Sequence, residues 1–321
     1  MYNIIDTMDS HRWTENSERL RLKLRAGDIV EVRTFDEIAY SLGDDGTMEG
    51  LPFQPEMAKY CGGIFRVLRP VKKLVVENAS TGLRGIRNIV LLNGVNCDGR
   101  FHDNCNRNCF ILWKEAWLKR PWTRQLPSDP PFDFSNTSQP THNQVPLPLA
   151  GYCQSITLLK ATYPLPGWNL KQYIWDITDN TLPILKRVIL LLISISRHIK
   201  KSINVQLPNM LSGPLEKTPS IDFDVQPGHW VEVKSLDEIR ATLDDSGRNR
   251  GLAFTKEMKK FCGQKFCVLR NVDQIIIEGT GETRKLSHTV ILKDANCDGF
   301  AHFLCSRNCY LLWRKIWLKK V

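Results

Sequence analysis

The sequence predicts an α+β fold built from two copies of a small, strongly bent β-sheet, an SH3-like partial barrel, with each copy ending in a helix. The first observation is an internal repeat, because residues 27–74 align without a gap with residues 228–275. After one deletion the repeat continues to the C-terminus. The second observation is that runs of β-branched residues recur in both copies, and the third is that signals for the start of a helix recur with them. We therefore expect a tandem duplication of one module.

The repeat divides the chain into five expected segments. These are a polar N-terminal lead-in (1–24), a first module (25–120), a Pro-rich linker (121–150), a helical insert (151–223) and a second module (224–321). The unrelated sequence between the two copies argues against a solenoid, in which repeats follow one another directly.

Local signals place the elements of each module. Residues 28–33 form a β-branched run typical of a strand, and Thr34 with Glu37 then forms a capping box that starts a helix. Ser235 with Glu238 repeats the box in the second copy. The remaining expected elements are a short helix at residues 55–60, strands at residues 65–76 and 86–92, and a terminal helix at residues 107–119.

The terminal helix is expected from the spacing of apolar residues. Cys109, Leu112, Trp113, Ala116 and Trp117 recur at the spacing of one helical face. A helix with this face buried would close the core of each module.

The insert contains further helical patterns, at residues 153–162, 169–177 and 182–203. In the last of these, basic residues share one side and apolar residues the other. One interpretation is a helix packed across the two modules. The other is a membrane-surface helix that buries its apolar side among anionic headgroups.

Composition and charge restrict the class of protein. The chain is 42% hydrophobic and 24% charged, which is typical of a globular protein, and its formal charge is +10. Such a charge suits an acidic protein, an anionic membrane surface or a nucleic acid. No secretory signal and no apolar run of about 18 residues is visible, so we expect a cytoplasmic protein, or one peripheral to the inner face of the membrane.

Ten cysteines in a reducing compartment favour metal binding over disulfides. Thiolate and imidazole are the usual ligands of zinc, and the pattern C-x4-H-x2-C-x3-C supplies both within a short segment of each copy. The candidate ligands are Cys61, Cys97, His102, Cys105 and Cys109 in the first copy and Cys262, Cys297, His302, Cys305 and Cys309 in the second. The sequence therefore predicts two zinc sites, against the alternative of buried core cysteines.

Five candidates compete for four positions around each zinc ion. We expect Cys97, His102 and Cys105 as ligands, with Cys61 or Cys109 as the fourth. An iron–sulfur cluster is the second choice of metal centre, since thiolates bind both. Cys97-Asp98-Gly99 resembles the start of the CDGSH iron–sulfur motif, but His102 lies one residue too far along and the upstream C-x-C is missing.

Signals for catalysis are weak. The chain has no G-x-S-x-G, P-loop or H-E-x-x-H motif. Glu56/Glu257 and Asp98/Asp298 are acids that both copies keep, but a glutamate near a helix start and an aspartate in a turn each have a plain structural role. The surplus of ligands favours closed, structural metal sites over an open catalytic site.

The amino-acid sequence of several segments resembles that of an uncharacterised family of bacterial tandem-repeat proteins. The shared segments are Gly50-Leu51-Pro52-Phe53, Cys61-Gly62, Trp113-Lys114-Glu115-Ala116-Trp117-Leu118 and Tyr163-Pro164-Leu165-Pro166. The resemblance covers about residues 24–321. It implies proximity to genes for natural-product or surface-polysaccharide biosynthesis and implies no activity.

Three functional hypotheses follow. The first is a zinc-stabilised scaffold or accessory protein of a biosynthetic pathway that binds protein partners. The second is a metalloenzyme or iron–sulfur redox protein of such a pathway. The third is a nucleic-acid-binding protein, which is disfavoured because the tryptophans of the terminal helices are expected in the core and not on a stacking surface.

Overall fold

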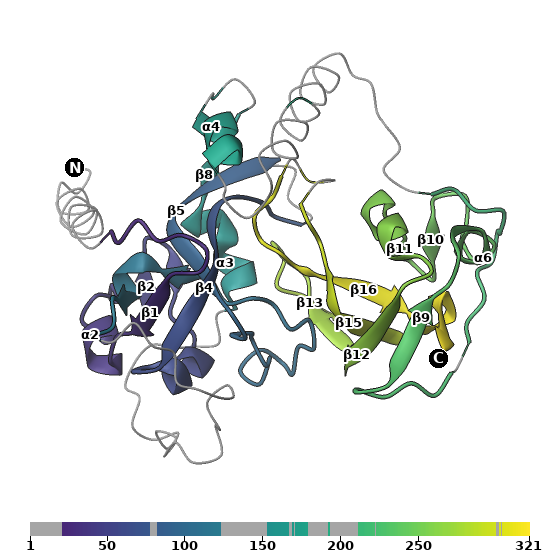
Figure 1. Ribbon diagram of the computed structural model, residues 1–321, viewed down its shortest axis with the longest axis horizontal. Helices are drawn as coiled ribbons and strands as arrows, with labels where there is room; N and C mark the ends of the chain where they lie inside the picture. The colour runs from purple at the N-terminus through teal and green to yellow at the C-terminus, as the bar shows by residue number, and fades with distance from the viewer. Residues whose placement is uncertain are drawn as a thin grey trace, which may run out of the picture.

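The computed structural model describes residues 21–77, 82–122, 153–166, 169, 171–178, 192, 211–221, 223–299, 302 and 304–321. This part of the chain is a mixed α+β protein dominated by strands (Figure 1). Nearly all of the expected Pro-rich linker, the lead-in to residue 20 and the expected helix at 182–203, residue 192 excepted, lie outside it. Among the helices described, none combines the length and apolarity needed to cross a bilayer.

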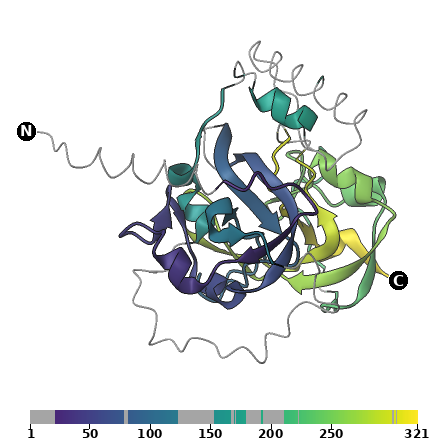
Figure 2. The same cartoon turned by 60° about the vertical axis from the view of Figure 1, so that its left-hand side comes forward.

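The first half of the chain forms a curled, half-barrel sheet with the strand order β6-β5-β4-β1-β7, in which β8 also pairs with β5. Its strands are β1 (Ile29–Val32), β4 (Ile64–Val75), β5 (Leu83–Leu92), β6 (Trp113–Lys114), β7 (Leu118–Lys119) and β8 (Tyr163–Pro164). The long strands β4 and β5 run side by side through this half (Figure 2). The register of β4 shifts twice along β5, and such bulges increase the bend of a sheet.

Short elements complete the first half. They are α2 (Phe35–Ala39), the two-residue strands β2 (Thr47–Met48) and β3 (Leu51–Pro52), and the 3₁₀ helices η1 (Pro55–Tyr60) and η2 (Glu115–Trp117). The insert contributes α3 (Gln154–Ala161) and α4 (Lys171–Thr178), close to the ranges expected from sequence. Helix α3 packs against β3.

The second half has the corresponding strand order, β16-β15-β12-β9-β17. Its elements are β9 (Trp230–Val233), α6 (Leu236–Arg240), β10 (Arg248–Asn249), β11 (Leu252–Ala253), η3 (Lys256–Phe261), β12 (Lys265–Asn271), β13 (Gln274–Ile276), β14 (Thr283–Lys285), β15 (Thr289–Asn296), β16 (Tyr310–Arg314), η5 (Lys315–Trp317) and β17 (Leu318–Lys320). Its register matches the first half, since Val231 pairs with Phe266 as Val30 pairs with Phe65.

Both capping boxes predicted from sequence are confirmed. The Thr34 and Ser235 hydroxyls accept hydrogen bonds from the backbone amides of Glu37 and Glu238, and each glutamate carboxylate accepts from the N-cap amide in return. A helix cap of this kind contributes about 1 kcal/mol. The two short helices therefore begin at the residues that the local sequence specifies.

The predicted terminal helix at residues 107–119 is wrong. The chain there forms β6, the single turn η2 and β7, and the second half likewise forms β16, η5 and β17. The two short strands pair with different neighbours, Trp113 opposite Val90 and Leu118 opposite Val32. A strand–turn–strand segment can bury the same residues as a helical face, so the spacing of apolar residues did not distinguish the two.

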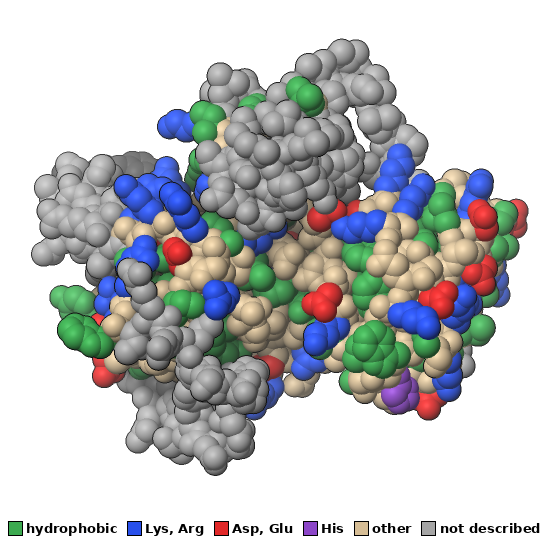
Figure 3. Space-filling view, in the orientation of Figure 1, with side chains coloured by type: hydrophobic (Ala, Val, Ile, Leu, Met, Phe, Trp, Pro, Cys, Tyr) green, Lys and Arg blue, Asp and Glu red, His purple; other side chains and the backbone are tan. Residues whose placement is uncertain are grey.

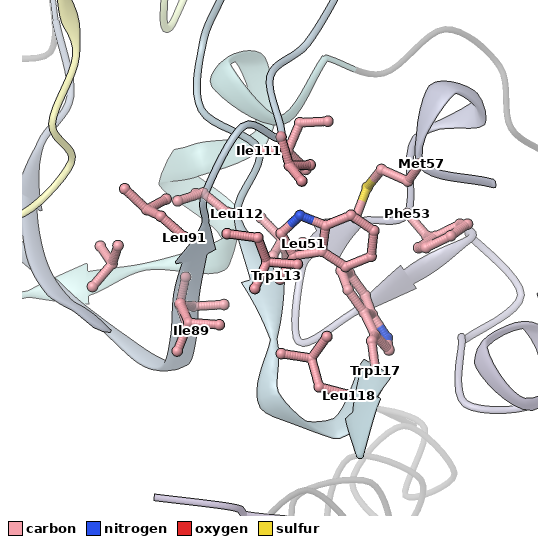
Figure 4. Packing of buried hydrophobic residues seen from close by; sticks show 14 of the residues in the cluster. Leu51, Phe53, Met57, Ile89, Leu91, Ile111, Leu112, Trp113, Trp117 and Leu118 are labelled. Carbon is pink, nitrogen blue, oxygen red and sulfur yellow. The ribbon is translucent and has the colours of Figure 1, made fainter. Parts of the chain in front are cut away.

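The tryptophans of this segment form the centre of the core (Figure 4). Phe53 lies edge-on to Trp113 and Trp117, with ring centroids 6.3 and 5.5 Å away. Phe254 packs against Trp313 and Trp317 in the same way, at 6.3 and 5.4 Å. All four tryptophans are fully buried, so they stabilise the fold and offer no stacking surface to a ligand.

The two halves meet through equivalent segments. The Asn106 amide donates to the Gln274 carbonyl at 2.8 Å, and the Ser306 amide donates to the Lys73 carbonyl at 3.0 Å. Phe110 of one half stacks on the ring of Tyr310 of the other, with centroids 5.2 Å apart. Residues at matching places in the repeat thus contact one another, as in an interface with twofold symmetry.

Two ion pairs with buried guanidinium groups reinforce this interface. Arg107 binds Glu77 in the first half, and Arg307 binds Glu278 in the second. The backbone amide of Glu77 also donates to the Glu278 carboxylate at 3.0 Å. Both guanidinium groups are largely buried, so removing either carboxylate would leave an uncompensated buried charge.

Candidate metal centre

Three buried side chains converge in the first half: Glu56, Cys97 and His102. Glu56 comes from the first turn of η1, Cys97 follows β5, and His102 lies in the loop after Cys97. One ligand atom from each lies within 4.8 Å of the other two. A carboxylate, a thiol and an imidazole are all ligands of zinc, so this arrangement is suited to hold a metal ion.

The distances within the first group are short. Glu56 Oε1 lies 2.7 Å from His102 Nε2 and 3.1 Å from Cys97 Sγ. The side-chain amide nitrogen of Gln54 lies 2.9 Å from the same His102 Nε2. A protonated Nε2 donates to Glu56, whereas an unprotonated Nε2 accepts from Gln54 and is the form that binds metal. Gln54 therefore faces the atom that would change partners when a metal binds.

A tight turn brings Cys97 and His102 together. Gly99 has φ +78°, and a Cβ atom there would lie 1.9 Å from the carbonyl oxygen of Cys105. The turn is closed by the His102 amide, which donates to the Gly99 carbonyl at 3.0 Å. The ammonium group of Lys59, in η1, binds the Asp98 carboxylate at 2.9 Å and ties the loop to the helix that carries Glu56. Only glycine fits this position, because any side chain would overlap backbone.

The second half repeats the group with Glu257, Cys297 and His302. Here His302 Nε2 lies 3.5 Å from Glu257 Oε1, and the His302 side chain is 45% exposed. The backbone amide of Gly299 donates to Cys297 Sγ at 3.3 Å. Two ligands on one tetrahedral zinc ion are about 3.4 Å apart, given bonds of about 2.1 Å. The second group is therefore close to the spacing of a zinc site, whereas the first is drawn into direct hydrogen bonds.

Each group contains a protonated thiol and a carboxylate oxygen without a partner, both of which could bind a cation. Burial, followed by the neighbouring Glu56 carboxylate, raises the pKa of the Cys97 thiol, and burial and Glu257 do the same for Cys297. Oε2 of Glu56 and Oε2 of Glu257 are buried without a hydrogen-bond partner. A divalent ion would satisfy these oxygens and displace the thiol protons.

Other predicted ligands lie elsewhere. Cys61 ends η1 and Cys262 ends η3, both half-buried, and burial raises the pKa of Cys61 to about 12. Neither sulfur belongs to the groups of three that converge within the described residues. Their sequence position, at the end of the helix that carries the glutamate, places them on the wrong end of that helix for this centre.

Cys105 and Cys305 lie at the interface between the halves. The backbone amide of Ile276 donates to Cys105 Sγ at 3.4 Å, and Cys305 makes the matching contact with the Val75 amide. The Cys105 side chain packs in a cluster with Ile275 and Ile276 of the second half. In the structure Cys105 therefore contacts the opposite half of the chain, and it is not part of the Glu56 group.

Cys109 and Cys309 lie at the ends of the loops that carry His102 and His302. Their carbonyl groups accept hydrogen bonds from the amides of Cys97 and Cys297, both at 2.8 Å. Burial raises the pKa of Cys109, and raises the pKa of Cys309 to about 12. Their backbones thus position the first ligand of each group, while their sulfur atoms are not among the three that converge.

Glu56 and Glu257 are the site residues that sequence reasoning passed over. Both were noted as acids kept in the two copies, but a place near a helix start supplied a sufficient structural explanation. Glu56 lies 41 residues before Cys97, so the one sequence signal for it is that both copies keep a glutamate at this position.

No family model matches the chain, and no similar chain was found among curated proteins or solved structures. The function of this protein is therefore inferred from its own residues.

Proposed function

We propose that this chain is a zinc-binding protein with two Glu-Cys-His sites, one in each half. The observation that carries the proposal is that the same three residue types converge at equivalent positions in both halves. Both copies of the repeat keep this donor set, although residues around it differ, as Gln54 and Thr255 show. The resemblance to bacterial tandem-repeat proteins supports a role as a scaffold or accessory protein in a biosynthetic pathway.

The donor set favours zinc over a cluster. Carboxylate, thiolate and imidazole all bind zinc with bonds of about 2.0–2.3 Å. Iron–sulfur clusters are held by four cysteines, or by two cysteines and two histidines. Each group found among the described residues supplies a single sulfur atom, which suits a mononuclear ion.

The first site fits a structural role. The side chains of His102 and Glu56 are 0% and 1% exposed, so substrate has no route to them without movement of the loop. A buried zinc site contributes folding free energy directly, because ligands that converge in the folded state are dispersed in the unfolded chain. The site would hold η1, the end of β5 and the following loop together.

The second site supports a different candidate function, that of a hydrolytic metalloenzyme. His302 is half-exposed, so solvent and a small substrate could reach the group. Glu257, Cys297 and His302 would hold the zinc ion, which would supply Lewis acidity for the activation of water. Hydrolysis of a p-nitrophenyl ester that is lost in His302→Ala and retained in His102→Ala would support this candidate.

A protein partner is preferred to a nucleic acid. On the face shown in Figure 3, Lys and Arg side chains are scattered over both halves, and acidic side chains alternate with them on the second half. A groove that binds nucleic acid is expected to be more uniformly basic. The alternative of a membrane-surface helix concerns residues 182–203, which lie outside the described ranges except for residue 192.

Elemental analysis of purified protein tests the proposal. We expect about two zinc ions per chain, one lost in Glu56→Gln and the other in Glu257→Gln. Cys61→Ser is the matched control, because Cys61 lies in the same half and outside the group, and it should keep both ions. Circular dichroism would show that each variant remains folded. A wild-type protein that has been expressed with zinc and carries none would contradict the proposal.

A further inference from the structure

A second candidate site lies in a pocket beside the sheet of the first half. The pocket has a volume of about 500 Å³ and is bordered by β4, β5 and the segment that precedes β1. Leu304 and Ser306 of the second half complete its wall, so it spans the two halves. This volume is in the range of pockets that bind small molecules and cofactors.

The wall of this pocket is strongly basic. Its charged residues are Arg21, Lys23, Arg25, Lys72, Lys73 and Glu115. The side chains of Arg21, Lys23 and Arg25 form no ion pair with any other residue in the described part of the chain. These three cations lie close together in one short segment and repel one another, and an anion in the pocket would relieve that repulsion.

The carboxylate in this wall is held by backbone amides and forms no ion pair with Arg21, Lys23 or Arg25 in the described part of the chain. Glu115 is buried and accepts hydrogen bonds from the amides of Lys23 and Leu24, at 2.8 and 3.2 Å. Lys23 has φ +52°, a left-handed conformation that costs an ordinary residue about 1 kcal/mol. Glu115 thus holds a strained segment that presents cations to the pocket, and strain of this kind tends to occur at functional sites.

The second half does not repeat the basic character. The positions equivalent to Lys23, Arg25, Lys72, Lys73 and Glu115 are Asp224, Gln226, Asp273, Gln274 and Lys315. Each cation is replaced by an acid or an amide, while neighbouring core positions keep their apolar character, as Leu24 and Val225 show. The charge of the pocket is therefore particular to the first half and is not a by-product of the shared fold.

We propose that this pocket binds a small polyanion, a molecule of nucleotide size that carries at least two phosphate charges. Arg and Lys side chains are the usual protein ligands of phosphate groups. The apolar part of the wall, which includes Ile89 and Leu304, suits the uncharged portion of such a molecule. The pocket is a compact recess of about 500 Å³, which fits a small molecule, whereas a duplex or a bilayer needs an extended basic surface.

Isothermal titration calorimetry with adenosine diphosphate and with adenosine tests the proposal on the full-length chain. We expect adenosine diphosphate to bind, adenosine to bind at least about tenfold more weakly, and the affinity for the diphosphate to fall as salt is added. Arg21→Gln/Arg25→Gln removes two exposed cations and should weaken diphosphate binding by about tenfold or more.

The control is Lys293→Gln, which removes an exposed cation from β15 of the second half and should leave the affinity unchanged. The proposal would be overturned if adenosine diphosphate showed no heat of binding at about 1 mM, the weak limit of specific recognition. Equal affinity of wild type and the double variant would also overturn it. So would binding of single-stranded DNA or of phosphatidylserine vesicles that the double variant loses while diphosphate binding is absent.

Discussion

The two metal groups use the same donor atoms in different surroundings. In the first, Glu56 and His102 are fully buried and hydrogen-bonded at 2.7 Å, and in the second, Glu257 and the half-exposed His302 are 3.5 Å apart. Gln54 faces the first imidazole, whereas the equivalent residue in the second half is Thr255. The repeat thus keeps the ligands, while the residues around them decide whether the group is closed or open.

The same lesson applies to the basic pocket. The two sheets have matching strand orders and registers, yet the positions that carry cations beside the pocket of the first half carry acids or amides in the second. The two halves therefore share a backbone arrangement, and substitutions of single side chains on it change which ligands each half can bind.

The largest expected effect tests the turn that both groups share. Gly99→Ala or Gly299→Ala should lower the free energy of unfolding by about 5 kcal/mol, or prevent folding, because the new Cβ would overlap a backbone carbonyl at 1.9 or 2.0 Å. Gly62→Ala is the matched control: Gly62 has a similar φ of +75° with no atom within 4 Å of the new Cβ, and about 1 kcal/mol is expected. Chemical denaturation measures all three, and equal effects at Gly62 and Gly99 would show that the loop can relax.

The next effect separates the buried group from the open one. His102→Ala should destabilise the protein by about 3 kcal/mol, since it leaves Glu56 buried without its partner. His302→Ala should cost about 1 kcal/mol or less, because His302 is half-exposed. Thermal melting of the two variants, each prepared with and without a chelator, gives the comparison. Equal destabilisation would mean that the two groups do not differ in the way their exposure indicates.

Exchanging the residues at positions 54 and 255 tests whether Gln54 makes the Glu56 group different from the Glu257 group. Gln54→Thr removes an amide that competes with the metal ion for His102 Nε2, so it should slow release of the first ion by about tenfold, the usual size of an effect from a residue next to a ligand. Thr255→Gln should speed release from the second group by a similar factor. Transfer of zinc to a chromogenic chelator measures both rates. Unchanged rates in both variants would remove Gln54 from the explanation of closure.

The smallest effect concerns the capping box, which is the same in both halves. The backbone hydrogen bond from Thr34, with further help from Arg33, holds the pKa of Glu37 below its usual 4.5. A carboxylate whose pKa is lowered on folding stabilises the protein above the pKa of the unfolded state, and this contribution disappears as the pH falls through the lowered value. Glu37→Gln should therefore melt below wild type at pH 7, and the difference should shrink as the pH falls below the usual pKa of glutamate. A difference that persists at the acid end would indicate lost packing and not lost charge.

Local signals specified the parts of the fold that depend on neighbouring residues. The capping boxes at Thr34 and Ser235 and the strands near residues 28–33 and 86–92 could be predicted, because hydrogen-bonding side chains and β-branched runs act over a few positions. The terminal helix could not be distinguished from a strand–turn–strand segment, because both bury Trp113 and Trp117. Pairing with β5 and β1, which are distant in sequence, decided the outcome.

The metal group was predictable only in part, for a similar reason. Cys97 and His102 share one loop, and their spacing alone brings them together. Glu56 comes from another element, so its approach depends on the fold. Cys105 has the spacing of a ligand but contacts Ile276 in the other half. No local sequence pattern predicts the interface between the halves.

X-ray absorption at the zinc edge tests the Glu-Cys-His assignment most directly, because sulfur and the lighter oxygen and nitrogen ligands scatter differently. We expect an average of one sulfur neighbour per zinc ion at about 2.3 Å, with the remaining neighbours oxygen or nitrogen at about 2.0–2.2 Å. An average of three sulfur neighbours would contradict the account, since it would mean that cysteines outside the two groups bind the metal in place of Glu56 and Glu257.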